Sequence, residues 1–131
     1  YVSTLDGLIA HLPVGADWGI RERERTRRFV AYHFDDDLAP ILLGRATLDP
    51  ELAELEAVHL QTMSEAAADN IRHGQQAGEL PDDIDADSAG AFVIGGLRHS
   101  IAQQLRTTPR PDPDLAAERL WHLTAAALGI S

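Results

Sequence analysis

Residues 71–106 read IRHGQQAGELPDDIDADSAGAFVIGGLRHSIAQQLR, and this stretch contains the clearest structural signals of the chain. It opens in the last turns of a helical pattern that Gly78 ends, because glycine commonly closes a helix and a proline follows soon after. An acidic turn comes next, in which Asp85 or Asp87 is suited to cap the following helix. That helix is expected over residues 88–106. The stretch therefore predicts two helices joined by a tight, capped turn.

Helical spacing continues in both directions from this stretch. Asp49 and Pro50 suit the N-cap and first position of a helix, and the apolar residues after them recur every three or four positions. This helix would run for about 28 residues, or roughly 40 Å. Other helices are expected over residues 2–12, 19–34, 38–43 and 113–129. Since no alternating β-branched run is present, the sequence predicts an all-α, single-domain fold of about six helices over residues 1–131.

Composition narrows the class of protein. The chain has 131 residues with a formal net charge of −10, so a polyanion such as DNA would be repelled by this chain alone. It contains no cysteine, which excludes disulfides and thiolate metal sites and is typical of a cytoplasmic protein. No apolar run approaches the ~20 residues needed to span a bilayer. We therefore expect a cytoplasmic protein without a membrane partner.

The last two expected helices carry apolar residues on two faces each. One face can pack in the domain's own core, and the other is most economically covered by a second copy of the chain. The alternative is that such a helix lies at the centre of one monomer, where other helices of the same chain cover both faces. Gly95 and Gly96, in mid-helix, suggest the close approach of another backbone or a ligand. The residues predicted for a homodimer interface are Leu97, Ile101, Leu105, Leu120, Trp121 and Leu128.

The order of these features resembles the C-terminal domain of TetR-family transcriptional regulators. The resemblance covers almost the whole chain, although each motif is degenerate. It includes a proline-broken loop and a last helix that ends at Leu128-Gly129. The residues that carry it most clearly are Ile71, Gly74, Gly78-Glu79, an acidic residue at Asp85 or Asp87, Ala89, Ala91 and Gly96.

The resemblance implies an effector-binding and dimerisation domain. In that family, the last two helices of each subunit form a four-helix bundle, and each subunit holds a ligand pocket. DNA is read by a separate N-terminal helix-turn-helix domain, which is absent from this chain and would connect through the helix over residues 2–12. The implied protein is a repressor that releases its operator when a small effector binds.

A pocket is also suggested by helical phase, because three expected helices each bring a histidine and a large apolar residue toward the interior. A mostly apolar cavity with a few polar groups is typical of small-molecule sites. The alternative is a solid core, in which His59 would need a hydrogen-bond partner. The predicted ligand-binding residues are Tyr32, His33, His59, Met63, Phe92 and His99.

Two other classes of function stay open. Glu56 and His59 have the E-x-x-H spacing of helical-bundle metal sites, which makes a small metal-binding protein or enzyme the alternative. The second class is a dimeric interaction module that binds no ligand. No catalytic residue is predicted, because no nucleophile motif or phosphate loop is present, and no cofactor is predicted.

Two features near the start of the second expected helix also have two interpretations. The alternating charges of residues 21–28 are typical of a solvated helix face, or they contact the missing DNA-reading domain or flanking phosphates. Trp18 either closes the mouth of the pocket or packs in the core.

Overall fold

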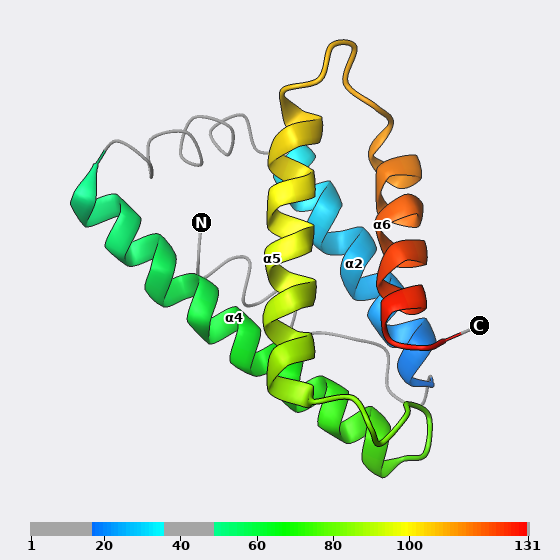
Figure 1. Ribbon diagram of the computed structural model, residues 1–131. Coiled ribbons are helices and arrows are strands. Elements are labelled where there is room, and N and C mark those ends of the chain that lie inside the picture. The colour runs from blue at the N-terminus through cyan, green and yellow to red at the C-terminus, as the bar shows by residue number, and fades with distance from the viewer. Residues whose placement is uncertain (1–16, 36–48, 131) are drawn as a thin grey trace.

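The structure is a computed structural model that describes residues 17–35 and 49–130. Within these ranges helices are the only regular secondary structure, which confirms the all-α class. The expected helices over residues 2–12 and 38–43 lie outside the described residues. The four helices that are described are α2 (Trp18–Asp35), α4 (Pro50–Gln76), α5 (Ala86–Leu105) and α6 (Pro113–Ala127) (Figure 1).

Short polar side chains fix where these helices begin. The carboxylates of Asp49, Asp85 and Asp112 each accept a hydrogen bond from a backbone N–H in the first turn of the helix that follows. These bonds satisfy donors that have no partner inside the helix. Asp85, one of the two caps expected for α5, is therefore the residue that caps it.

Glycines fix where α4 and α6 end. Gly78 and Gly129 both have φ of +77°, a conformation that favours glycine. Beyond Gly78, the N–H of Glu79 donates to the carbonyl of Gly74 at 2.9 Å, and the equivalent bond after α6 joins Ile130 to Ala125. This is the Schellman arrangement, and it turns the chain sharply back after each helix.

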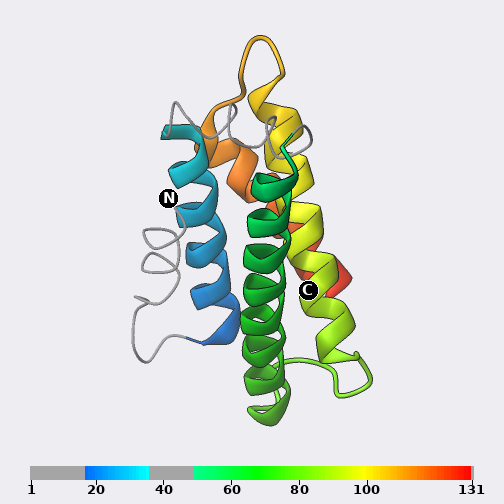
Figure 2. The same cartoon turned by 90° about the vertical axis from the view of Figure 1, so that its left-hand side faces the viewer.

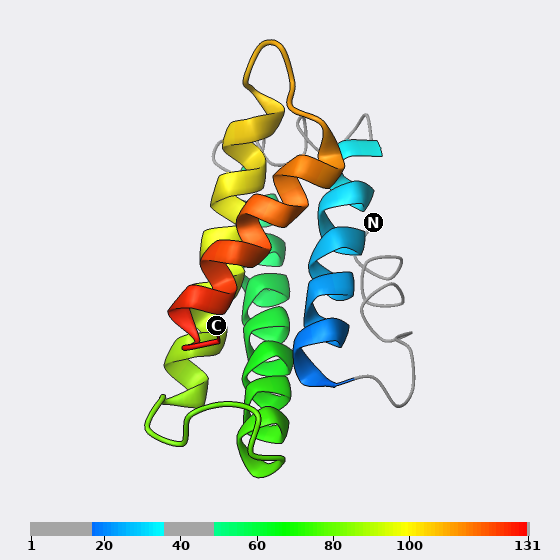
Figure 3. The same cartoon turned by 90° about the vertical axis from the view of Figure 1, so that its right-hand side faces the viewer.

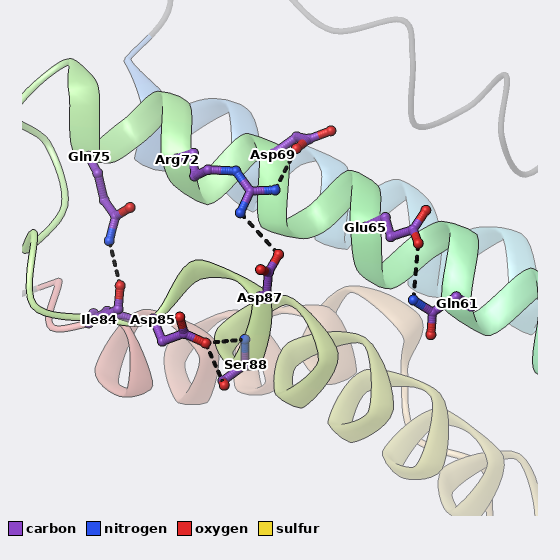
Figure 4. Close-up of polar contacts among 9 residues, drawn as sticks. All are labelled: Gln61, Glu65, Asp69, Arg72, Gln75, Ile84, Asp85, Asp87 and Ser88. Atoms are coloured by element: carbon purple, nitrogen blue, oxygen red, sulfur yellow. Dashed lines mark hydrogen bonds and ion pairs between the residues drawn. The ribbon is translucent and has the colours of Figure 1, made fainter.

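The helices pack as two pairs, α4 on α5 and α2 on α6, as Figures 2 and 3 show from the two sides. Polar contacts clamp the start of α5 to α4 (Figure 4). Arg72 pairs with Asp69 at 2.7 Å and with Asp87 at 3.0 Å, and the side-chain amide of Gln75 donates to the carbonyl of Ile84 at 2.8 Å. The turn between the two helices is thus held at both of its ends.

The close approach of helix backbones occurs at Gly90. A Cβ atom at Gly90 would lie 2.6 Å from the carbonyl oxygen of Ser64 and 2.7 Å from the backbone nitrogen of Ala68, so only glycine fits where α5 crosses α4. The close approach expected at Gly95 and Gly96, to another backbone or a ligand, is not made by another helix of the described chain. A Cβ at either position would meet open space instead, because both glycines lie on the outer side of α5.

The core forms two clusters at opposite ends of the bundle. One cluster joins all four helices, and the other packs around Trp18 near the turn between α4 and α5. Five of the six residues predicted for the dimer interface are buried in these clusters of the single chain, and Trp121 packs against the second: Leu97, Ile101, Leu105, Leu120 and Leu128. Most of these side chains thus pack on α2 and α4 within the chain, while Leu97 and Leu120 also line a groove between α5 and α6. No helix in the described part of the chain is long and apolar enough to cross a membrane.

Candidate functional site

A cavity of about 540 Å³ lies between the two helix pairs and is lined by all four helices. Most of its wall is apolar, and it is floored by buried residues of the core such as Phe29, Met63 and Leu97. Thr62, Ala66 and Asp69 on its α4 side are exposed, which places the mouth there. A hollow of this size and lining is typical of sites for small organic molecules.

The spacing of residues along α2 explains its contribution to the cavity. Trp18, Glu22, Arg25, Thr26 and Phe29 follow one another at helical intervals and all line the wall. Trp18 is the first residue of α2 and is almost fully buried. Its indole N–H donates to the carbonyl of Asn70 at 2.7 Å, so Trp18 both packs in the core and forms one end of the cavity.

An ion pair is built into the α2 wall. The Arg25 guanidinium donates to the Glu22 carboxylate at 2.8 Å, and both side chains are more than four-fifths buried. Burial raises the pKa of Glu22 above its ordinary value, against the opposing charges of Arg25 and Arg21. Burial likewise lowers the pKa of Arg25. The pair is thus partly desolvated, a setting in which charge strongly influences what binds.

Arg25, on this wall, and its neighbour Arg21, outside the lining, each have a hydrogen-bond donor that is not used within the described residues. The Nε atoms of Arg25 and Arg21 are buried and have no hydrogen-bond partner in the described part of the chain. A buried N–H donor without an acceptor costs roughly 1–3 kcal/mol. Because both atoms are fully buried, neither presents its N–H to the cavity.

The structure brings only one of the predicted ligand-binding residues to the cavity wall. Met63 is buried and lines it. His59 is buried one turn earlier on α4, outside the lining, and its Nε2 lacks a hydrogen-bond partner among the described residues. His33 is buried beside Phe29 and bonds to its carbonyl oxygen through Nδ1, at 2.8 Å. Tyr32 is half-buried against the His33 ring.

Phe92 and His99 lie away from the cavity. Both are exposed, and 72% of the Phe92 surface is accessible. The helical phase placed them together correctly, but their stripe of α5 points outward, because the stripe that contains Leu97 is the one that faces α2 and α4. The expectation that Phe92 and His99 line the pocket is therefore corrected.

Sequence reasoning missed Glu22 and Arg25. The alternation of charges from residue 21 to 28 suggested a solvated face, and Arg23 and Arg27 do lie on such a face. The overlooked signal was the stripe from Trp18 to Phe29, which passes through Glu22 and Arg25. Two apolar residues eleven positions apart on one stripe place the charges between them on the inner side of the helix.

An apolar groove of about 300 Å³ crosses the outer face of α5 and α6. Phe92 and Leu123 stand on it with 72% and 65% of their surfaces exposed, and Gly96 leaves open space between them. Exposed apolar patches of this kind mark interaction surfaces more often than isolated exposed residues do. This outer face, defined here by Phe92, Gly96, Leu123 and Ala127, is called the α5/α6 groove below.

Glu56, the acidic member of the E-x-x-H pair, binds an arginine in the structure. The carboxylate of Glu56 forms an ion pair with Arg98 of α5, and both side chains are largely buried. This contact joins α4 to α5. Within residues 17–35 and 49–130, no group of three or more histidine or acidic side chains is placed to hold a metal ion. The geometry thus gives Glu56 a structural role in joining the two helices.

Comparison with known proteins returned no relative. No family model, no curated protein and no solved structure matches the chain.

Proposed function

We propose that this chain is the effector-binding and dimerisation domain of a TetR-like transcriptional repressor. The observation that carries the proposal is the cavity of about 540 Å³ between the two helix pairs. The effector is a small, mostly apolar molecule that binds in this cavity. Operator DNA is bound by a separate N-terminal helix-turn-helix domain, and the acidic charge of this chain suits a domain that does not itself contact DNA.

The position of the cavity supports a regulatory role for its occupant. Its walls belong to two helix pairs, α4 with α5 and α2 with α6, that share few contacts with each other. A ligand in the cavity contacts both pairs and favours the arrangement in which they enclose it best. Binding can shift the protein toward that arrangement only by the difference in the ligand's affinity for the two states.

The α5/α6 groove supports dimerisation. It is apolar, exposed and formed by the same two helices that the family resemblance assigns to the dimer interface. A second copy of the chain, related by a two-fold axis, would place Phe92 of one subunit against the same groove of its partner. The interface is thus formed by the outer face of α5 and α6, with the inner face in the core.

A matched pair of variants tests the proposal. Purified chain is screened by thermal shift against a small-molecule library that contains neutral, cationic and anionic apolar compounds. Compounds that stabilise the wild type should lose their effect in Ala67→Phe, because this side chain lies in the cavity wall and phenylalanine would fill the space. Ala57→Phe, at an exposed position of the same helix, should keep the effect.

Two outcomes would contradict the proposed function. One is a library without any compound that stabilises the chain. The other is a set of compounds whose effect survives Ala67→Phe, since these would bind elsewhere.

A further inference from the structure

We propose that the effector cavity and the dimer interface share one wall, so that an apolar ligand and a second copy of the chain strengthen each other's binding. The shared wall is formed by Val93 and Leu97 of α5 and Thr124 of α6. The inference rests on the proposed function, because it concerns the regulation of the same cavity and the same interface. It goes beyond that function by making the partner subunit part of the ligand site.

Two hollows meet at the shared wall. Val93, Leu97 and Thr124 line both the cavity of about 540 Å³ and the α5/α6 groove of about 300 Å³. The cavity lies on the inner side of α5 and α6 and the groove on their outer side, so one layer of side chains separates the two spaces. The two helices share few direct contacts with each other. A change in the shared wall therefore acts on both hollows at once.

The hollows leave the shared wall without support on either side. Val93 and Thr124 are only half-buried, and each lines both spaces. A side chain beside an empty space loses the dispersion contacts that neighbouring atoms would supply. An occupant of either hollow restores those contacts and holds the wall in one arrangement, at a cost in side-chain entropy. The second occupant then meets a wall that is already ordered, so the two binding events favour each other.

The distribution of charge selects a second copy of the chain as the occupant of the groove. Apart from His99, residues 88–105 of α5 contain one ionisable side chain, Arg98, and it is largely buried in its ion pair with Glu56. A net charge of −10 repels two copies of the chain wherever their acidic surfaces meet. The outer face of α5 is thus where two copies approach at the least cost, and depletion of charge is typical of the centre of an interface.

The shape of the groove also suits a second copy. Phe92 and Leu123 project from it, while a Cβ atom at Gly96 would meet nothing within 4 Å. A two-fold axis across the groove would let Phe92 of each subunit enter the hollow at Gly96 of its partner. Phe92 of the partner subunit then supports the shared wall from outside, as a ligand supports it from inside. The ligand site is therefore incomplete in a monomer.

A neutral fluorescent probe measures the coupling from both directions. N-Phenyl-1-naphthylamine, an apolar compound whose emission rises when it leaves water, is titrated into the full 131-residue chain above and below the dimer dissociation constant. The probe should bind the dimer at least ~5-fold more tightly than the monomer, which is the lower end of typical coupling between sites. Reciprocally, analytical ultracentrifugation should show that saturating probe lowers the dimer dissociation constant by at least the same factor.

Matched variants separate the interface from the cavity. Leu123→Glu lies in the groove and outside the cavity lining, so it should give a monomer whose probe affinity equals that of the diluted wild type at every protein concentration. Val58→Glu adds the same charge at an exposed position of α4 that lines neither hollow, and it should keep the dimer and the wild-type affinity. Ala67→Phe fills the cavity and should abolish probe binding, which distinguishes a probe in the cavity from one in the groove.

The outcomes separate this inference from the proposed function. Equal probe affinity in dimer and monomer, or a dimer dissociation constant that the probe leaves unchanged or raises, would overturn the shared-wall coupling. Probe binding that survives Ala67→Phe, or no probe binding, would overturn it as well. The proposed function would survive these results if the wild type is a dimer and another compound binds and is blocked by Ala67→Phe. A wild type that stays monomeric at all concentrations would refute the dimer and the coupling together.

Discussion

Glu22 and Glu24 lie two residues apart on α2 and face opposite surroundings. Glu22 is on the cavity wall, where burial raises the pKa of its carboxyl above the ordinary value of 4.5. Glu24 is on the outer side, where hydrogen bonds from Arg27 and Arg28 lower the pKa of its carboxyl to about 2. About half a turn of helix thus separates a carboxylate that resists ionisation from one that favours it.

The two glutamates should titrate in a fixed order. NMR of the ¹³C-labelled carboxyl groups should give a midpoint above 4.5 for Glu22 and a midpoint near 2 for Glu24. A Glu22 midpoint at or below that of Glu24 would contradict the placement of Glu22 on the cavity wall.

The same shifts predict opposite effects on stability. The folded chain binds a proton at Glu22 more tightly than the unfolded chain does, so the contribution of Glu22 is lost as pH rises from 4.5 through its raised pKa. The ionised Glu24 carboxylate stabilises the folded chain above pH 4.5, and this stabilisation is lost as pH falls toward 2. Urea unfolding should therefore show a smaller loss of stability between pH 4.5 and pH 2.5 for Glu24→Gln than for the wild type.

Gly90→Ala should destabilise the fold. The added methyl group would lie within 3 Å of the α4 backbone, and backbone cannot move aside as a side chain can. We expect a loss of about 1–3 kcal/mol, as for other overpacked cores. Gly95→Ala is the control, since a Cβ there meets open space, and it should gain up to ~1 kcal/mol from helix propensity. Equal effects of the two substitutions on urea unfolding would contradict the packing at Gly90.

Phe92→Glu and Leu123→Glu should convert the chain from dimer to monomer. Each puts a charge on the α5/α6 groove, and burial of two copies of that charge in a symmetric interface is unfavourable. Light scattering coupled to size-exclusion chromatography gives the mass directly. Val58→Glu adds the same charge at an exposed apolar position of α4 and should remain dimeric. A monomeric wild type would refute the groove as a dimer interface.

Glu56→Gln should weaken the link between α4 and α5. It would leave the largely buried guanidinium of Arg98 without its carboxylate partner, at a cost of about 1–2 kcal/mol in the free energy of unfolding. Glu54→Gln, at an exposed position of the same helix, should change little. If Glu56→Gln left stability unchanged but removed a stoichiometric metal ion from the purified chain, the E-x-x-H pair would be a metal site after all.

Local chemistry made the helices predictable from the sequence. The Asp49-Pro50 start, the cap at Asp85 and the glycine stop at Gly78 are signals carried within a few residues, and the structure uses all three. The two-faced character of α5 was equally clear. The sequence could not tell which face points inward, because both stripes are apolar and the choice depends on where α2 and α4 lie.

The candidate site was predicted only in part for a related reason. Met63 was expected in the interior and lines the cavity, because it lies on a single, clear apolar stripe of α4. Glu22 and Arg25 were missed because charge normally indicates solvent, and their burial depends on a partner one turn away and on a wall supplied by other helices. Phe92 was misplaced because burial was assumed for a large aromatic side chain, whereas it stands exposed on the α5/α6 groove.

The methyl group of Met63 offers the most direct test of the cavity as the ligand site. Met63 is the single methionine of the chain, is buried, and lines the cavity. A sample labelled with ¹³C at the methionine methyl group therefore reports on this space alone. On titration with the compound that most stabilises the chain, the methyl signal should shift with saturation and show nuclear Overhauser contacts to the ligand. A compound that saturates the protein without shifting this signal or contacting this methyl group would contradict the account.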